Sequence, residues 1–158
     1  MKKQSGLLRR LTALALALCM LAALTAEIFA ADTVASGYCG SEGDGKNLTW
    51  TLDSEGVLTI SGLGKMKDYE NDNKNRAPWY SSRKSLKKLV LKSGITSIGD
   101  YAFFDCSNLT GDLKIPSNVH SIGENAFGYC SGFNGSLTIE NGVVEIKKYA
   151  FYHCKGFT

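Results

Sequence analysis

Few side chains in this sequence have the type and spacing needed for catalysis or metal binding. The two histidines, His120 and His153, are the available general bases for a cysteine nucleophile. The alternating acids Asp68, Glu70 and Asp72 could offer oxygen ligands to calcium, but the glycine and the distal glutamate of a full calcium loop are missing. The sequence has no Ser/His/Asp grouping and no phosphate-binding glycine motif. We therefore expect no catalytic residue, no bound metal and no cofactor.

Three of the five cysteines recur at a spacing of 24 residues, and each closes a copy of one repeated segment. The copies read ITSIGDYAFFDC (95–106), VHSIGENAFGYC (119–130) and VVEIKKYAFYHC (143–154). Because the apolar positions match while the residues between them vary, the repeat separates a core from a surface. A repeat of this length predicts a solenoid, whose coils bury their apolar faces against each other. The predicted core residues are Ile98, Phe103, Cys106, Ile122, Phe127, Cys130, Ile146, Phe151 and Cys154.

The position of these cysteines in the repeat indicates how they are used. A fixed register beside phenylalanine and alanine predicts a column of buried, reduced thiols rather than a disulfide framework. The closely spaced cysteine pairs typical of zinc sites are absent. Cys39 lies apart from the repeats, in the glycine-rich segment 37–40, and is expected to be a free or buried thiol.

Short elements must position these residues within each repeat. Residues 89–91, 113–115 and 137–139 predict three-residue strands, with two side chains pointing inward and one outward. Residues 124–129 predict a helical turn. The expected fold is mainly β with short helical turns, and about three coils of 23–24 residues occupy residues 85–158.

A different pattern precedes the repeats. Apolar residues alternate with polar ones on both sides of the glycine-containing loop 53–56, which predicts a β-hairpin within residues 47–61. Pro78 is expected to open a short helical turn. Trp50 and Trp79 would then cover the open first coil, since an uncovered solenoid end exposes apolar faces. We therefore expect a cap module at residues 47–84, preceded by a flexible leader at residues 31–46.

Residues 1–30 have the pattern of a secretory signal peptide. A basic start precedes an apolar run from residue 11 to residue 26, and small residues follow at Ala30 and Ala31, the preferred cleavage point. Cleavage after Ala35 is the fallback. An uncleaved anchor helix is the alternative, because the apolar run approaches the lower limit of about 17 residues for a membrane span. A lipoprotein site at Cys19 is disfavoured, because Leu18 stands where a small residue is expected.

The charge of the chain changes when this leader is set aside. Residues 1–30 carry four of the 18 basic residues and one of the 15 acidic ones, which leaves 14 of each. A balanced domain has no net attraction for nucleic acid, and none is expected as a partner. A local basic cluster remains, which we interpret as a solvated edge of the first coil, with a polyanion site as the alternative. It consists of Arg83, Lys84, Lys87, Lys88 and Lys92.

The repeats resemble the BspA-type leucine-rich repeats. The signature of that family is a leucine-led strand ending in Ile-Pro, followed by V-x-S-I-G-x-x-A-F-x-x-C, and residues 113–116 and 119–130 match it closely. Residues 37–80 also resemble the amino-terminal module that often precedes such repeats. The resemblance implies a secreted or cell-surface protein, a role in adhesion or protein binding, and usually no catalytic activity. Cleavage of the leader would leave no membrane span.

The residues that differ between successive repeats are the candidates for recognition, because packing fixes the inward positions. On the strands they mix charged and small polar side chains without an aromatic cluster, which suits a protein partner better than a carbohydrate. The predicted binding face consists of Lys88, Val90, Lys92, Asp112, Lys114, Ser136, Thr138 and Glu140.

The carboxyl end predicts a second role. Thr158 aligns with Asn134 of the preceding repeat, so the strand that would complete the last coil is missing. The chain is then either a piece of a longer repeat protein or a product that ends with an open edge. Such an edge favours end-to-end self-association, and a structural module that stacks on further repeats is the alternative to a binding scaffold.

Overall fold

The computed structural model describes residues 31–158, of which Thr33–Thr158 form one compact unit. This unit is mainly β-structure with almost no helix. Within residues 31–158, no helix is long and apolar enough to cross a membrane. The predicted signal peptide at residues 1–30, with Cys19 and Ala30, lies outside the described residues.

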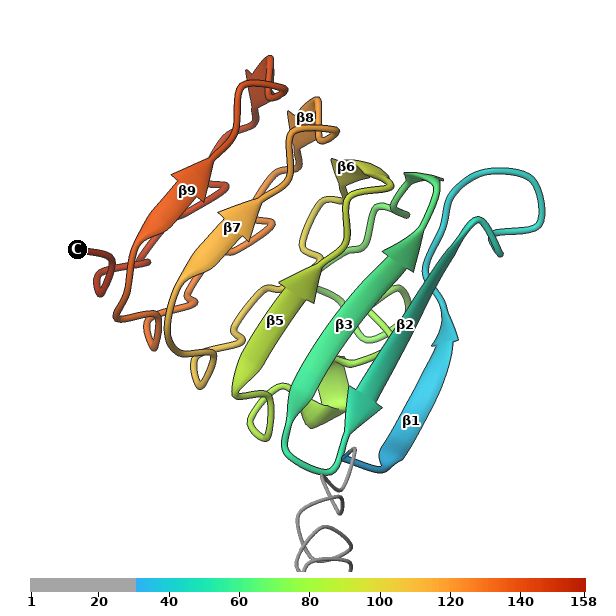
Figure 1. The fold of residues 1–158 in the computed structure, drawn as a ribbon, viewed down its shortest axis with the longest axis horizontal. Helices are drawn as coiled ribbons and strands as arrows, with labels where there is room; N and C mark the ends of the chain where they lie inside the picture. Colours follow the sequence, from blue (N-terminus) through green and yellow to red (C-terminus); the bar gives the residue numbers. More distant parts are fainter. Residues whose placement is uncertain (1–30) are drawn as a thin grey trace, which may run out of the picture. The chain divides into compact units, whose positions relative to one another are not determined.

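The predicted hairpin is confirmed. Strand β2 (Leu48–Asp53) pairs antiparallel with β3 (Val57–Gly62), as Figure 1 shows. The Oδ1 atom of Asp53 accepts hydrogen bonds from the backbone N–H groups of Glu55 and Val57, at 3.0 and 2.9 Å. Gly56 completes the turn with a φ of 85°, a left-handed conformation that favours glycine.

The segment expected to be a flexible leader contains a strand, so this part of the domain prediction is wrong. Strand β1 (Thr33–Tyr38) pairs antiparallel with β2, and Gly37 lies opposite Trp50. A Cβ atom at Gly37 would approach Trp50 Nε1 to 2.9 Å, so only glycine leaves room for the indole ring. Strand β1 is held mainly by its backbone hydrogen bonds to β2, because its side chains are largely exposed. A prediction from the pattern of apolar residues therefore could not detect this strand.

Parallel strands follow in two rows. Next to β3 lie β5 (Lys88–Leu91), β7 (Leu113–Ile115) and β9 (Leu137–Ile139), side by side in Figure 1. The second row contains β4 (Gly64–Lys65), β6 (Ile95–Ile98), β8 (Ser121–Ile122) and β10 (Glu145–Ile146). Paired residues in β7 and β9 are 24 positions apart, as are those in β6, β8 and β10. The sequence repeat is thus also the spatial repeat.

A column of stacked rings fills the core between the rows. Phe103 stacks on Phe127 with ring centroids 5.1 Å apart, and Phe127 stacks on Phe151 at 5.2 Å. Trp79 extends this column on the other side of Phe103, with ring centroids 5.4 Å apart. Trp50 contacts Trp79 edge to face, with ring centroids 5.9 Å apart. The two tryptophans therefore cover the first ring of the column, where the sequence placed a cap.

The helical turn predicted at residues 124–129 is wrong. Asn125 and Tyr129 have φ angles of 49° and 62°, and two left-handed residues so close together do not continue a helix. The same two positions are left-handed in the other repeats, at Tyr101, Asp105, Tyr149 and His153. Among residues 31–158, the only helical element is the short 3-10 turn η1 (Tyr80–Ser82), next to the turn predicted at Pro78.

Side chains connect neighbouring repeats where the strands are too short to do so. Asp100 Oδ1 accepts a hydrogen bond from the backbone N–H of Glu124 at 2.7 Å, and Asn108 Nδ2 donates to the carbonyl of Lys84 at 2.6 Å. Both bonds join residues 24 positions apart. They satisfy backbone groups that would otherwise lack a partner.

The predicted core is buried except in the last repeat. Ile98, Phe103, Cys106, Ile122, Phe127 and Cys130 are at most 1% exposed. Phe151 and Cys154 are half-buried, and Ile146 is 50% exposed, so its assignment to the core is wrong. Ile146 lies on β10, the edge strand of its sheet, with a neighbouring strand on one side only.

Candidate binding surfaces

Six of the eight residues predicted to form the binding face line one open groove of about 550 Å³ on the strands β5 and β7. These six are Lys88, Val90, Lys92, Asp112, Lys114 and Glu140. Strand alternation brings them together, because β7 buries Leu113 and Ile115 and turns Lys114 outward. The other two, Ser136 and Thr138, are exposed but do not line the groove.

Part of the charge in this groove is paired within the chain. Lys114 Nζ lies 2.7 Å from Glu140 Oε1, and this hydrogen bond lowers the pKa of Glu140 below its ordinary value. Glu140 Oε2 also accepts the backbone N–H of Ser117 at 2.9 Å. Lys88 and Lys92 form no ion pair with any side chain of residues 31–158. A partner would therefore meet these two ammonium groups first.

Asp112 has a local role in the same groove. Its Oδ1 atom accepts the backbone N–H and the hydroxyl of Ser136, at 2.7 and 2.9 Å. These bonds, the backbone one first, lower the pKa of Asp112. The carboxylate thus positions the start of β9, and one of its oxygens remains for a partner.

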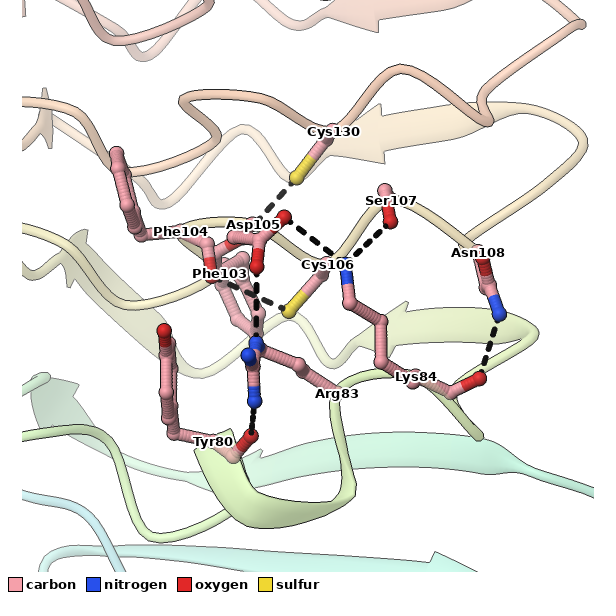
Figure 2. Close-up of polar contacts among 10 residues, drawn as sticks. All are labelled: Tyr80, Arg83, Lys84, Phe103, Phe104, Asp105, Cys106, Ser107, Asn108 and Cys130. Atoms are coloured by element: carbon pink, nitrogen blue, oxygen red, sulfur yellow. Dashed lines mark hydrogen bonds and ion pairs between the residues drawn. The ribbon is translucent and has the colours of Figure 1, made fainter.

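The basic cluster is partly neutralised by Asp105. Arg83 Nε and Lys84 Nζ each lie 3.0 Å from an oxygen of this carboxylate, as Figure 2 shows. Burial raises the pKa of Asp105, but the hydrogen bonds from Arg83 and then Lys84 outweigh it, so that the pKa lies below its ordinary value. Lys84 also donates to Ser107 Oγ at 2.9 Å. These contacts pair Arg83 and Lys84 within the chain, and the interpretation of the whole cluster as a solvated edge stays a prediction.

The repeat cysteines are free thiols, as predicted, and the structure adds a role for them. Cys130 Sγ donates to the carbonyl of Phe103 at 3.0 Å, and Cys154 Sγ donates to that of Phe127 at 3.0 Å. These two thiols therefore bond to the backbone of the preceding repeat, whereas Cys106 Sγ lies 3.9 Å from the carbonyl of Phe104 in its own repeat. Cys39 is also free, at 2% exposure, and burial raises its pKa to about 12.

The candidates for catalysis and calcium binding do not converge. His153 stacks on the ring of Tyr129 at 5.0 Å, and the neighbouring Cys154 thiol is turned to the Phe127 carbonyl. Asp68 Oδ1 accepts the backbone N–H of Asp100 at 2.9 Å. Within residues 31–158, no three His, Cys, Asp or Glu side chains gather in a way that could hold a metal ion.

A second hollow, which the sequence analysis missed, lies outside the strand face. We call it the aromatic cup. It has a volume of about 340 Å³ and is formed mainly by the turns that follow β6, β8 and β10. It is lined by Asn71, Tyr101, Phe104, Asn125, Tyr129, Tyr149 and Tyr152. The signal was present in the sequence, because aromatic residues recur at positions of the repeat that lie outside the strands.

Comparisons with known proteins agree with this architecture. Residues 77–158 match the family model described as "BspA type Leucine rich repeat region (6 copies)". The crystal structure of a leucine-rich repeat protein from Eubacterium ventriosum ATCC 27560, at 2.50 Å resolution, is similar with a TM-score of 0.58 and 36% sequence identity. The similarity covers 71% of this chain and 28% of that one, so this chain corresponds to less than a third of that protein. No curated protein matches the sequence.

Proposed function

Because the chain belongs to the family of BspA-type leucine-rich repeats, we propose that it is a secreted or cell-surface scaffold that binds a protein partner without catalysis. The repeats form a solenoid of about three coils behind the amino-terminal sheet. The observation that carries the proposal is the groove on β5 and β7, in which the variable strand positions gather. The signal-peptide pattern of residues 1–30 supports export.

The composition of the groove indicates the kind of partner. Lys88 and Lys92, free of intrachain ion pairs with the described residues, flank the half-buried Val90. An acidic segment with an apolar side chain between its charges would complement this arrangement. With only about three coils, the strand face should offer less than the ~800 Å² per partner of a stable interface, so one copy should bind weakly and several copies should act together.

A charge-reversal experiment tests this function. The variant Lys88→Glu with Lys114→Glu should capture less partner from host matrix extract than the native chain, at equal circular dichroism. The variant Lys74→Glu with Lys155→Glu has the same net charge and changes exposed residues outside the groove, so it should bind like the native chain. Equal capture by both double variants would contradict the proposed groove, and hydrolysis of a captured partner would contradict the absence of catalysis.

A structural role is the second candidate function. Val144 is 84% exposed and Ile146 is 50% exposed, so β10 and the turn before it present apolar side chains along a strand edge. A further repeat or a second chain would bury them. In this case the module stacks on other repeats or fronts a longer surface protein.

A further inference from the structure

Two asparagine–glycine pairs lie near the strand β9, one on each side of it. Asn134–Gly135 precedes β9, and Asn141–Gly142 lies in the turn between β9 and β10. Such pairs can modify themselves, because the backbone nitrogen of the glycine can attack the side-chain amide of the asparagine. Glycine favours this attack, since it has no Cβ atom and its backbone rotates freely. Both asparagines are exposed, so access to water does not distinguish the two pairs.

Hydrogen bonds hold the first pair in place. The backbone N–H of Gly135 donates to the carbonyl of Gly111 at 3.1 Å, and Asn134 Oδ1 accepts the backbone N–H of Gly111 at 2.8 Å. The attacking group and its target are therefore both bound to the preceding repeat, and both bonds must break before they can react. The Asp44–Gly45 pair, which could undergo the related ring closure, is held as well, because Gly45 N–H donates to the carbonyl of Glu42 at 2.9 Å.

The second pair lacks such bonds. Among the residues that the structure describes, no group forms a hydrogen bond with the backbone N–H of Gly142 or with the side-chain amide of Asn141. The turn is closed by one bond, from Val143 N–H to the carbonyl of Glu140, and its length of 3.5 Å exceeds the usual limit of about 3.2 Å. The equivalent bond before β8, donated by Val119, measures 3.0 Å.

The position of this turn makes its opening easy. It joins β9 and β10, and within residues 31–158 each of these strands has a neighbouring strand on one side only. The apolar side chains Ile139 and Ile146 at its two ends are 37% and 50% exposed, so little buried surface holds the turn closed. Segments with few buried contacts open locally at low cost. The backbone rotation that brings the Gly142 nitrogen to the side chain of Asn141 therefore needs only this turn to open.

We propose that Asn141 is a site of self-modification, at which the chain converts a side-chain amide into a carboxylate. The backbone nitrogen of Gly142 loses its proton to a base in the solvent and attacks Cγ of Asn141. The Cγ–Nδ2 bond breaks, and the nitrogen leaves with a proton as ammonia, which closes a succinimide ring. Water then adds to one of the two ring carbonyls and opens the ring, giving aspartate or isoaspartate. Water is the only co-reactant, and no atom is oxidised or reduced.

The new charge would lie beside the groove on β5 and β7. Glu140 and Ser117 line that groove, and the turn packs closely on the second of them, since a Cβ atom at Gly142 would clash with the carbonyl oxygen of Ser117. A carboxylate at Asn141 would therefore stand next to that of Glu140 and oppose an acidic partner. This consequence rests on the proposed function. It implies that the affinity of the groove falls as the protein ages.

Incubation of the full chain in mildly alkaline water enriched in heavy oxygen tests the site, because each conversion places one labelled oxygen in the new carboxylate. Peptide mass mapping should show that Asn141 converts at least about tenfold faster than Asn134 in the folded chain, since only the second pair reacts without breaking two hydrogen bonds. In urea the two rates should become similar. Equal rates in the folded chain would overturn the proposal. Labelling of both asparagines in urea but of neither in the folded chain would also overturn it.

Two variants at the same position complete the test. Asn141→Gln keeps an uncharged amide but would have to close a larger ring, so its peptide should stay unlabelled over the time in which the native chain converts. Asn141→Asp mimics the product. It should bind a synthetic peptide with two glutamates flanking a leucine a few-fold more weakly than Asn141→Gln does. Equal binding by the two variants would overturn the effect on the groove, whereas the labelling experiment needs no ligand and decides the modification separately.

Discussion

At the scale of the residue, Cys130 and Cys154 act as hydrogen-bond donors to the preceding repeat, from a buried and a half-buried position. The sequence predicted their burial, because their register matches that of the core phenylalanines. It could not predict the bonds to Phe103 and Phe127, since the donor and the acceptor are 27 positions apart and meet only after the repeats stack. Burial raises the pKa of Cys106 to about 12, that of Cys154 to about 11, and that of Cys130 well above its ordinary value.

This difference in pKa predicts an order of thiol reactivity. Cys154, which is half-buried and has the lower pKa of the three, should react first with a maleimide or with Ellman's reagent at neutral pH, because the thiolate is the reactive form. Cys106 and Cys130 should react only as the protein unfolds. Peptide mass mapping after timed labelling measures the order. A native disulfide between Cys106 and Cys130, or labelling of Cys130 before Cys154, would contradict this arrangement.

The ring column predicts unequal costs of truncation. Phe127 has a stacked ring on both sides, whereas Phe151 has one on one side only. Phe127→Ala should therefore lower the free energy of unfolding by about 3–5 kcal/mol, and Phe151→Ala by less. Because a domain has a total stability of roughly 5–15 kcal/mol, the first variant should be close to unfolding at room temperature. Urea denaturation of both variants measures the two losses. A larger loss for Phe151→Ala than for Phe127→Ala would show that ring stacking along the column is not what stabilises the fold most.

At the scale of the element, the turns were the hardest part to predict. Residues 124–129 contain alanine and phenylalanine in an order compatible with a helix, and no local pattern indicates the left-handed conformations at Asn125 and Tyr129. Asparagine tolerates this conformation, but tyrosine rarely adopts it. Stacking of the repeats imposes it on both. The strands, in contrast, were predictable because their alternation is local.

The turn at Asp105 predicts a dependence of stability on pH. The pKa of Asp105 is lower in the folded protein than the value of about 3.9 expected in the unfolded chain. The ionised carboxylate of Asp105 therefore contributes to stability fully at pH values above about 3.9, and this contribution is lost as the pH falls through the pKa of the folded state. Asp105→Asn, which suits the φ of 56°, should cost about 0.5–1 kcal/mol at pH 7, given the partial exposure of the ion pairs.

Thermal unfolding between pH 2 and pH 7 measures this effect. The melting temperatures of the native chain and of Asp105→Asn should differ at pH 7 and converge below roughly pH 3. Glu55→Gln removes an exposed acid that forms no ion pair with the described residues and should follow the native curve throughout. A difference that persisted at pH 2 would show that the carboxylate charge is not its cause.

At the scale of the whole molecule, the sequence predicted the strand face better than the aromatic cup. Outward positions on a strand follow from the period of two, so Lys88 and Lys114 could be placed on one face from their spacing. The cup depends on residues of three successive repeats. Such a hollow follows from the differences between repeats, which a consensus pattern conceals.

The exposed edge predicts self-association. Val144 and Ile146 should make the chain associate with rising concentration, because burying them removes apolar surface from water. Sedimentation velocity of the native chain should show a concentration-dependent shift, and Val144→Lys with Ile146→Lys should remove it. Leu63→Lys changes a side chain that is 76% exposed between β3 and β4, and serves as the control. A native chain that stays monomeric at all concentrations would rule out this mode of assembly.

The hydrogen bonds between side chains and the neighbouring repeat also bear on how such genes change length. Asp100 bonds to Glu124, Asn108 to Lys84 and Asp112 to Ser136, and in each pair the two residues are 24 positions apart along the chain. A tandem duplication of 24 codons supplies both members of each pair again, in the correct register. The coding sequence can therefore gain or lose whole repeats by unequal recombination while every new repeat finds its hydrogen-bond partners already encoded.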